Sequence, residues 1–291
     1  MTYATQEQLR VTPLGDKIGA QIDGIDLAAP LDAGAVASLK DAWERHLVLR
    51  FRGQSHLTLQ GQIAFSRHFG ELDKRPIASK AMHASVQQLP EEIAVISNVK
   101  IDAQPIGGLG DGESVWHADM TYNPAPPRAA LLHAHEVPAS GGDTEFLNLY
   151  AAHDSLPQGL KQAIADLDCI HDASLNSAGE LRLGFERVTD PRHTVGARHP
   201  LVRIHPVTGR KSLYLGRRRN AYVPGLPLAD SEDLLDALWA HAVQDAFTWR
   251  QQWQAGDLVA WDNRVTLHRR DAFDPLARRL MYRTQVSDRA Q

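Results

Sequence analysis

A candidate metal-binding set, with two residues close together and a third far along the chain, most constrains the fold of this protein. His117 and Asp119 stand two positions apart, and His268 follows near the C-terminal end. On a β-strand, residues i and i+2 point to the same face, so a strand here would bring both side chains to one metal ion. Two imidazole nitrogens and one carboxylate oxygen suit Fe(II) and leave three positions open in an octahedral shell. The pattern therefore predicts an open catalytic site.

The His-x-Asp pair carries little weight by itself, because the chain contains 14 histidines. Its alternative interpretation is a strand whose polar groups are only hydrogen-bonded. Several further motifs occur in a fixed order around it: W-H-A-D at 116–119, S-G-G-D-T-E-F at 140–146, G-D-L-V-A-W-D-N-R at 256–264 and A-R-R at 277–279. Several motifs in order are far more specific than any one of them.

These motifs resemble the taurine dioxygenase and 2,4-dichlorophenoxyacetate dioxygenase (TauD/TfdA) family of Fe(II)- and 2-oxoglutarate-dependent oxygenases. The resemblance covers nearly the whole chain. It implies a double-stranded β-helix, which is a distorted jelly roll, with flanking helices. It also implies Fe(II) held by His117, Asp119 and His268, with 2-oxoglutarate and O2 as cosubstrates. The pattern of strands and helices alone indicates only a β-rich α+β fold.

Arg279 and Thr144 are the predicted anchor of 2-oxoglutarate. In the family, the matching threonine and the second arginine of A-R-R bind the carboxylate remote from the iron. A guanidinium group suits this task because it donates two parallel hydrogen bonds to a planar carboxylate. Taken alone, Arg279 would more often be a surface residue on an edge strand, and Thr144 a plain strand residue.

Arg283 is the main predicted contact of the prime substrate. It lies four positions after Arg279 and should face the same side of one strand. In the taurine branch the matching arginine binds the substrate sulfonate, so an arginine here implies an anionic substrate group. The alternative is a structural ion pair, for example with Asp262 or Glu145.

Three further residues complete the predicted substrate contacts, namely Arg75, Glu113 and Asn98. Arg75 and Glu113 replace a histidine and an asparagine of the taurine enzymes, and Ala78 replaces an aromatic residue, which argues against taurine itself. Arg75 and Glu113 have an equally plausible alternative as solvated charges. Asn98 belongs to a segment similar to the herbicide-degrading branch. The run at 217–219, with three arginines, is either a basic patch for an anion or, more commonly, solvated surface.

Composition limits the cellular setting. A hydrophobic content of 43% and a charged content of 23% are typical of a soluble globular protein. The net charge of −4 gives no reason to expect nucleic acid or an acidic membrane as a partner. The single Cys169 excludes an intrachain disulfide framework, and no secretory signal is visible at 1–7. We therefore expect a cytoplasmic enzyme that acts on small molecules, with no membrane span. Self-association into a homo-oligomer is a separate expectation.

The chain is expected to form one domain over 1–291, with lid-like insertions near 73–92, 100–114 and 172–198. Apolar residues at helical spacing predict helices at 33–46, 58–69 and 230–244, with two shorter ones at 151–156 and 159–166. Strands are predicted at 47–51, 128–137, 144–149, 247–253, 257–262, 265–270 and 279–286. The glycine-rich stretch at 107–112 lacks the setting of a phosphate-binding loop and is expected to be a lid hinge.

The leading functional hypothesis is oxidation of a C–H bond in a small anionic substrate, such as an aryloxyalkanoate. Hydroxylation or desaturation of an amino-acid-like or sulfonate metabolite is the alternative within the same chemistry. A non-catalytic jelly-roll binding protein would require a lost ligand, and none is lost. A zinc hydrolase could use the same three ligands, but it would not account for Arg279.

Overall fold

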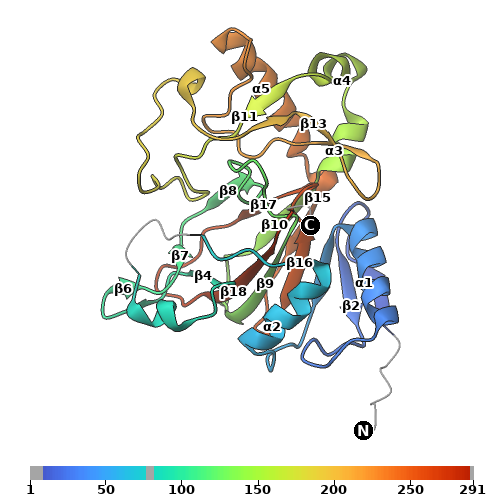
Figure 1. Cartoon of the computed structure of the whole chain (residues 1–291), viewed down its shortest axis with the longest axis vertical. Coiled ribbons are helices and arrows are strands. Elements are labelled where there is room, and N and C mark those ends of the chain that lie inside the picture. Colours follow the sequence, from blue (N-terminus) through green and yellow to red (C-terminus); the bar gives the residue numbers. More distant parts are fainter. Residues whose placement is uncertain (1–8, 77–81, 289–291) are drawn as a thin grey trace.

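Two β-sheets pack against each other at the centre of the molecule (Figure 1). The computed structural model describes residues 9–76 and 82–288. The larger sheet consists, in spatial order, of β1 (Arg10–Pro13), β2 (Ala20–Asp23), β3 (Val48–Phe51), β16 (Leu258–Asp262), β9 (Ala129–Glu136), β18 (Leu280–Val286), β4 (Ala94–Ser97) and β7 (Gly108–Leu109). The smaller sheet consists of β15 (Thr248–Gln251), β10 (Thr144–Asn148), β17 (Thr266–Arg270) and β8 (Ser114–His117).

The central strand β9 is buried on both faces. Ala130 and Leu132 pack in the layer between the two sheets, where Phe146 of β10 also lies. Ala129 and Leu131 point the other way and pack under the helices on the outer face. This period of two explains why the strand is an almost continuous apolar run in the sequence. The two packed sheets with flanking helices confirm the predicted jelly roll.

Helices α1 (Ala33–His46) and α2 (Leu59–Ser66) cover the outer face of the larger sheet (Figure 1). The side chain of Asp32 caps α1 by accepting a hydrogen bond of 2.7 Å from the amide of Ala35. The helix ends at Leu47, whose φ of 65° is left-handed. The prediction of a helix at 33–46 is confirmed. The one at 58–69 ends earlier, because the chain continues from Arg67 to Phe69 as a 3-10 helix.

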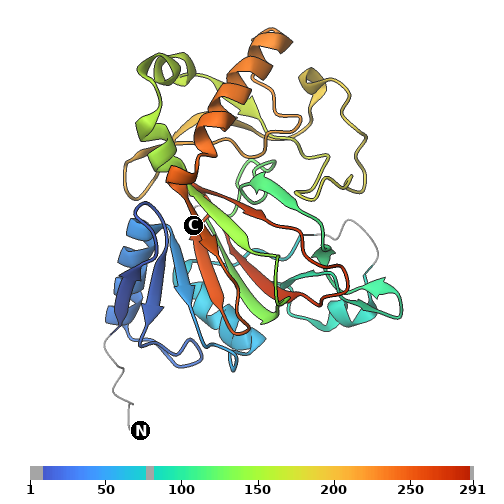
Figure 2. The same cartoon turned by 180° about the vertical axis from the view of Figure 1, so that it is seen from behind.

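A second group of elements lies at the opposite end of the molecule from α1 and α2, as both views show (Figures 1 and 2). Helices α3 (Leu149–Ser155), α4 (Gln158–Ile164) and α5 (Leu228–Ala242) share one apolar cluster there. Two short strand pairs accompany them, β11 (Asp168–Ile170) with β12 (Arg198–Pro200) and β13 (Val202–Ile204) with β14 (Lys211–Leu213). Each predicted helix is present, displaced by one or two residues.

The three predicted insertions differ in structure. The segment 172–198 contains one short 3-10 helix, Pro191–His193. The expectation of loop at 100–114 is wrong in part, because β5 (Lys100–Ile101) pairs with β6 (Gln104–Pro105) and β7 joins the larger sheet. Residues 77–81, within the predicted insertion at 73–92, lie outside the described residues. Residues 1–8 also lie outside them, so the expectation that this segment is not a secretory signal is not addressed by the structure. No helix in 9–76 or 82–288 is long and apolar enough to cross a membrane.

Candidate metal and cosubstrate site

The side chains of His117, Asp119 and His268 converge at the edge of the smaller sheet, beside its neighbouring strands β17 and β8. β8 and β17 pair so that His117 lies opposite His268, and their ring centroids are 4.2 Å apart. Asp119 joins them, and the three candidate ligand atoms all lie within 4.8 Å of one another. All three residues are buried. The structure therefore brings together the three residues that the sequence selects as metal ligands.

Asp119 reaches this site by a route that strand alternation does not explain. β8 ends at His117, and Asp119 lies in the turn that follows, before Met120 with its left-handed φ of 54°. Buried Asn263 holds that turn: its Oδ1 accepts from the amide of Asp119 at 2.7 Å, and its Nδ2 donates to the carbonyl of Asp119 at 2.9 Å. The expected strand through both ligands is corrected to a strand end plus a turn fixed by a side chain.

The protonation states of the three residues suit a divalent cation. Burial, together with the nearby His268, lowers the pKa of His117 well below its ordinary value. Burial lowers the pKa of His268 to about 4. Burial opposes the ionisation of Asp119, but Arg283 and the two histidines outweigh it and lower the pKa of that carboxyl. At neutral pH the site thus offers two neutral imidazoles and one carboxylate, which are the forms that bind metal.

His117 has a defined orientation. Its Nδ1 lies 2.7 Å from the carbonyl oxygen of Val115, which accepts the ring proton there. That hydrogen bond leaves Nε2, 3.7 Å from Oδ1 of Asp119, to face the site as a donor of electrons. Nδ1 of His268 is buried and has no hydrogen-bond partner among the described residues. Both observations fit imidazole groups whose nitrogens are oriented and free to bind a metal ion.

Arg283 contacts the predicted metal-ligating carboxylate directly. Its Nη1 donates to both oxygens of Asp119 at 3.0 Å, and Gln285 adds a third hydrogen bond of 3.2 Å. Arg283 thus forms an ion pair, as the alternative prediction stated, but its partner is Asp119. The two partners named in that prediction, Asp262 and Glu145, pair with other arginines. Arg283 therefore holds Asp119 while it also lines the cavity beside it.

Arg279 is buried and forms no ion pair with any described residue, although the charge of Asp143 acts on it from a greater distance. It is 1% exposed, and its Nε and Nη1 have no hydrogen-bond partner among the described residues. Burial, aided by the nearby Arg270, lowers its pKa to about 9, so it remains a cation at neutral pH. Thr144 lines the same cavity, and its hydroxyl oxygen accepts from Nε1 of Trp253 at 3.0 Å, which leaves its proton available to donate. Because an unpaired buried cation is costly, this end of the cavity fits an anionic ligand.

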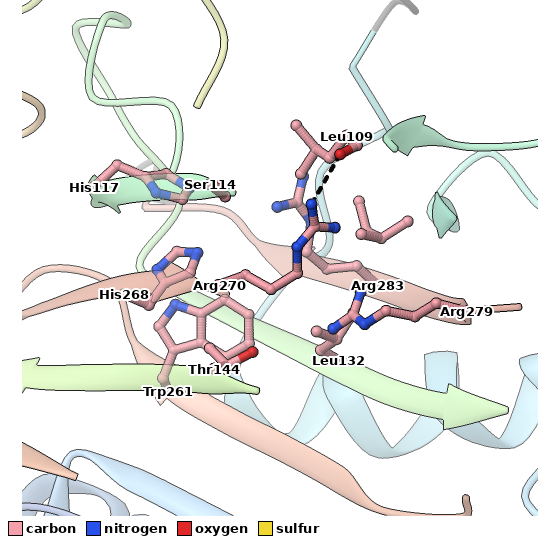
Figure 3. A pocket seen from close by; sticks show the side chains of 11 residues that line it. Leu109, Ser114, His117, Leu132, Thr144, Trp261, His268, Arg270, Arg279 and Arg283 are labelled. Atoms are coloured by element: carbon pink, nitrogen blue, oxygen red, sulfur yellow. Dashed lines mark hydrogen bonds between the residues drawn. The ribbon is translucent and has the colours of Figure 1, made fainter. Parts of the chain in front are cut away.

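Figure 3 shows how these side chains surround one small cavity of about 40 Å³. His117 and His268 lie at one end, and Arg279 lies toward the other. The lining residues are Ile96, Leu109, Ser114, His117, Leu132, Thr144, Trp261, His268, Arg270, Arg279 and Arg283. The cavity thus connects the candidate ligands with the unpaired guanidinium, as a chelating dicarboxylate requires.

Arg270 is a lining residue that the sequence reasoning missed. It is 5% exposed and donates to the carbonyl oxygen of Leu109 at 3.0 Å (Figure 3). It also donates to the carbonyl oxygens of Gly110, at 3.0 Å, and Gly112. It stands two positions after His268 on β17, so strand alternation could have placed it on the same face. The glycine-rich segment predicted as a hinge is therefore tied to the strand that carries a candidate ligand.

A second, larger cavity of about 700 Å³ opens beside the same centre. Its lining includes His117, Asp119 and Arg283, together with residues of all three predicted insertions. Arg75 is one of them, and its Nη1 donates to the carbonyl oxygens of Leu89 at 3.2 Å and Pro90 at 2.8 Å. The structure thus places two of the four predicted substrate contacts, Arg283 and Arg75, on this wall.

The other two predicted contacts lie elsewhere. The side chain of Glu113 is 58% exposed and pairs with Arg269 at 3.6 Å, outside the lining of either cavity. Asn98 also lies outside both linings, and its Oδ1 accepts from the amide of Arg279 at 3.0 Å, while its Nδ2 donates to the carbonyl of Ala277 at 2.8 Å. Asn98 therefore positions the backbone that carries Arg279, and a direct substrate contact by either residue finds no support here.

Comparison with known proteins gives consistent matches over nearly the whole chain. The family model described as taurine catabolism dioxygenase TauD, TfdA family matches residues 10–285. The chain is 34% identical to the (S)-phenoxypropionate/alpha-ketoglutarate-dioxygenase of Delftia acidovorans, over 98% of this chain and 97% of that protein. It is 35% identical to the alpha-ketoglutarate-dependent sulfate ester dioxygenase of Pseudomonas putida, over 90% of this chain and 83% of that protein. The crystal structure of AAD-2 in complex with Mn(II) and N-oxalylglycine matches with a TM-score of 0.78 and 32% identity, over 98% of this chain and 99% of that one.

Proposed function

Because this chain belongs to the TauD/TfdA family of dioxygenases, we propose that it oxidises a C–H bond of a small anionic substrate, with aryloxyalkanoate-like carboxylates as the leading class. Membership makes the protein a 2-oxoglutarate-dependent non-haem iron dioxygenase that uses Fe(II), 2-oxoglutarate and O2. When bound, these supply the oxidation of the substrate C–H bond, with release of succinate and carbon dioxide.

In this proposal, His117, Asp119 and His268 bind the iron, and Arg279 with Thr144 binds the remote carboxylate of 2-oxoglutarate. The observation that carries it is the unpaired guanidinium of Arg279 in the cavity that also contains the two histidines. A metal ion alone gives no reason to bury a cation with free donors, whereas a dicarboxylate does. That argument disfavours a zinc hydrolase, and the complete set of ligands disfavours a non-catalytic binding protein.

Arg283 and Arg75 are proposed to bind the acid group of the prime substrate. Arg283 uses Nη1 for Asp119 and borders both cavities, so it can couple substrate binding to the orientation of a metal ligand. Trp261 is 1% exposed beside His268, with ring centroids 4.9 Å apart, and helps to exclude water from the site. Sulfate or sulfonate compounds remain the second candidate class, because one relative is named for sulfate esters; amino-acid-like metabolites are the third.

Anaerobic titration of the purified protein with Fe(II) and then 2-oxoglutarate tests the cofactor assignment. We expect a weak visible charge-transfer band that needs both additions, and no such band with Zn(II). His117→Ala, Asp119→Ala and His268→Ala should each abolish the band and the release of succinate while leaving the fold intact by circular dichroism. Wild-type turnover in Asp119→Ala would show that the iron assignment is wrong.

A substrate panel scored by succinate release tests the substrate class. Small carboxylates, with aryloxyalkanoates among them, should be better substrates than taurine. Arg283→Ala should raise the substrate KM strongly, measured at saturating Fe(II). Because Arg283 also holds the carboxylate of Asp119, uncoupled 2-oxoglutarate turnover should fall as well. A wild-type preference for neutral or cationic substrates would refute the acidic-substrate proposal.

Small-molecule substrates are common to the named relatives. A cytoplasmic location and the lack of nucleic-acid or membrane partners are supported by the net charge of −4 and by the single cysteine. Assembly into a homo-oligomer stays a prediction, which sedimentation velocity of the purified protein would test.

A further inference from the structure

The wall of the larger cavity contains a second cationic site besides Arg283. We propose that Arg182 and Arg217 bind a second acid group of the prime substrate, so that the preferred substrates are small dianions with an apolar body between their acid groups. This inference rests on the proposed function, because it takes the larger cavity as the site of the prime substrate. It narrows the substrate class from an anion to a dianion.

The charge of the cavity is the first observation. Four arginines line it, namely Arg75, Arg182, Arg217 and Arg283, and among its described lining residues the one carboxylate is that of Asp119. Asp119 already pairs with Arg283 and is assigned to the metal. The positive charge of the other arginines is thus uncompensated within the wall. A cavity of this kind attracts anions and disfavours neutral or cationic molecules.

Arg217 is buried and only partly satisfied. It is 8% exposed, and its Nη1 donates to the carbonyl oxygens of Leu175 at 2.6 Å and Asn176 at 2.9 Å. These neutral acceptors hold the side chain in place without neutralising it. Its Nε is buried and has no hydrogen-bond partner among the described residues. Burial and the nearby Arg182 lower the pKa of Arg217 to about 10, so it stays charged at neutral pH.

Arg182 is the second member of the site. It comes from the 172–198 insertion, and its guanidinium lies 3.8 Å from the ring centroid of Tyr122, which also lines the cavity. Its Nε is buried without a hydrogen-bond partner, and no carboxylate of the described chain forms an ion pair with it. Two neighbouring guanidinium groups repel each other, and an anion bound between them removes that repulsion.

Arg218 and Arg219, which follow Arg217 in the sequence, differ from it in their ion pairs and in their exposure. Arg218 forms ion pairs with Glu232 at 2.8 Å and Asp236 at 2.6 Å on the surface, and Arg219 is exposed. Solvated surface was the more common interpretation of this run, and it is wrong for Arg217. Arg218 forms two ion pairs, whereas no carboxylate of the described residues forms an ion pair with Arg217, although the charges of Asp172 and Asp119 act on it from a greater distance. An inner arginine without an ion pair can bind an anionic ligand.

The rest of the wall defines the body of the substrate. Apolar side chains from the insertions complete the lining, namely Met82, Val86, Ile106, Leu183 and Phe185. The volume of about 700 Å³ lies in the range of sites that enclose a molecule with a ring and several substituents. An aromatic or alkyl body with an acid group at each of two positions fits this combination of charge and apolar surface.

Calorimetric binding to the anaerobic holoenzyme, loaded with Fe(II) and 2-oxoglutarate, tests the inference. The probes are phenoxyacetate and 4-carboxyphenoxyacetate, which share the ring, the ether and the first acid group. We expect the wild type to bind the dianion about tenfold more tightly, as one additional charge-assisted contact predicts. Arg182→Gln should reduce the affinity for the dianion to that for phenoxyacetate, and the affinity for phenoxyacetate should change less than about twofold.

Two further variants keep the test decisive. Arg217→Lys retains the positive charge beside residues 175 and 176 but lacks the two parallel donors of a guanidinium group. Its affinity for the dianion should therefore lie between those of the wild type and Arg182→Gln. Arg219→Gln is the matched control and should leave both affinities unchanged. Equal wild-type affinities for the two probes, or an Arg182→Gln variant indistinguishable from Arg219→Gln, would overturn the second site.

Failure of this inference is distinguishable from failure of the proposed function. If phenoxyacetate drives succinate release while Arg182→Gln leaves dianion binding unchanged, the second site is wrong and the proposed function stands. If the selective loss of dianion binding is found but neither probe drives succinate release, the second site stands and the proposed aryloxyalkanoate oxidation is wrong.

Discussion

Asp119 illustrates how much of this site depends on single contacts. The carboxylate accepts from Arg283 and Gln285, and the backbone on either side is fixed by other groups. Asn263 bonds the amide and the carbonyl of Asp119, and the next amide back, that of Ala118, donates to the carbonyl of Gly216 at 3.0 Å. A turn residue without a strand to hold it needs such partners, because its backbone has no ladder to join.

Asn263→Ala should therefore weaken iron binding without touching a ligand. We expect a loss of about 10- to 100-fold in affinity, the usual effect of removing a residue that orients a metal ligand. Competition with a chromophoric chelator measures it. An unchanged affinity in folded Asn263→Ala would show that the turn is held by other contacts.

Arg279 offers the clearest test of cosubstrate binding. Arg279→Ala should weaken 2-oxoglutarate binding by about 2–5 kcal/mol, because the buried carboxylate loses its charged partner. Calorimetric titration of the anaerobic iron-loaded protein gives this number directly. Arg278→Ala is the matched control, since Arg278 is adjacent, exposed and paired with Glu136 at 2.6 Å. Equal affinities in the two variants would remove Arg279 from the site.

At the scale of elements, β17 links the candidate metal ligand His268 to the wall of the cavity. His268 and Arg270 occupy one face of the strand, and Arg270 extends to the carbonyl oxygens of residues 109, 110 and 112. Arg269, between them, points away and pairs with Glu145 at 2.6 Å. Strand β17 thus carries both a candidate metal ligand and an arginine that holds residues 109–112 by hydrogen bonds.

Arg270→Gln should loosen that segment. Three carbonyl oxygens lose a charged donor, so amide hydrogen exchange over 108–112 should rise at least about tenfold, with little change in β9. Exchange measured by mass spectrometry on the intact protein checks this. Arg269→Gln serves as the control on the opposite face of β17. Unchanged exchange in Arg270→Gln would mean that β7 alone holds the segment.

For the whole molecule, buried neutral histidines set the response to acid. Burial lowers the pKa of His171 to about 3, and burial with the nearby His135 lowers that of His133 to about 4. Their ordinary value is 6.5. Between that value and the folded one, the unfolded chain binds a proton that the folded protein does not. Stability is therefore complete above about pH 6.5 and declines as the pH falls toward 4.

The free energy of unfolding of the metal-free protein in urea should accordingly be lower at pH 5 than at pH 7. His171 alone accounts for about 2 kcal/mol, because one unit of pKa shift corresponds to about 1.4 kcal/mol. His171→Gln should reduce the slope of that free energy with pH, whatever its effect at pH 7. Equal free energies at the two pH values would contradict the assignment of these side chains as neutral.

The sequence by itself determined the elements and the chemistry. Periodicity located α1, α2 and α5 to within a few residues, because their buried faces repeat at helical spacing. The motif order identified the family and selected the candidate metal triad and Arg279, because several motifs in a fixed order are more specific than any one of them. Strand alternation, which places Arg283 on the face of Arg279, also places Arg270 on the face of His268.

Only the tertiary structure decided how these side chains are held and what else surrounds them. Asp119 is fixed by Asn263 across 144 positions of sequence. Arg182 lies near Arg217 because the insertion at 172–198 and the segment after β14 line the same cavity. Glu113 pairs outward with Arg269, although its position near a ligand suggested the pocket. The physical reason is that charge and spacing in a sequence give the type of a side chain and its nearest neighbours along the chain. Its burial and its counter-charge depend on residues that only folding brings within a few ångströms.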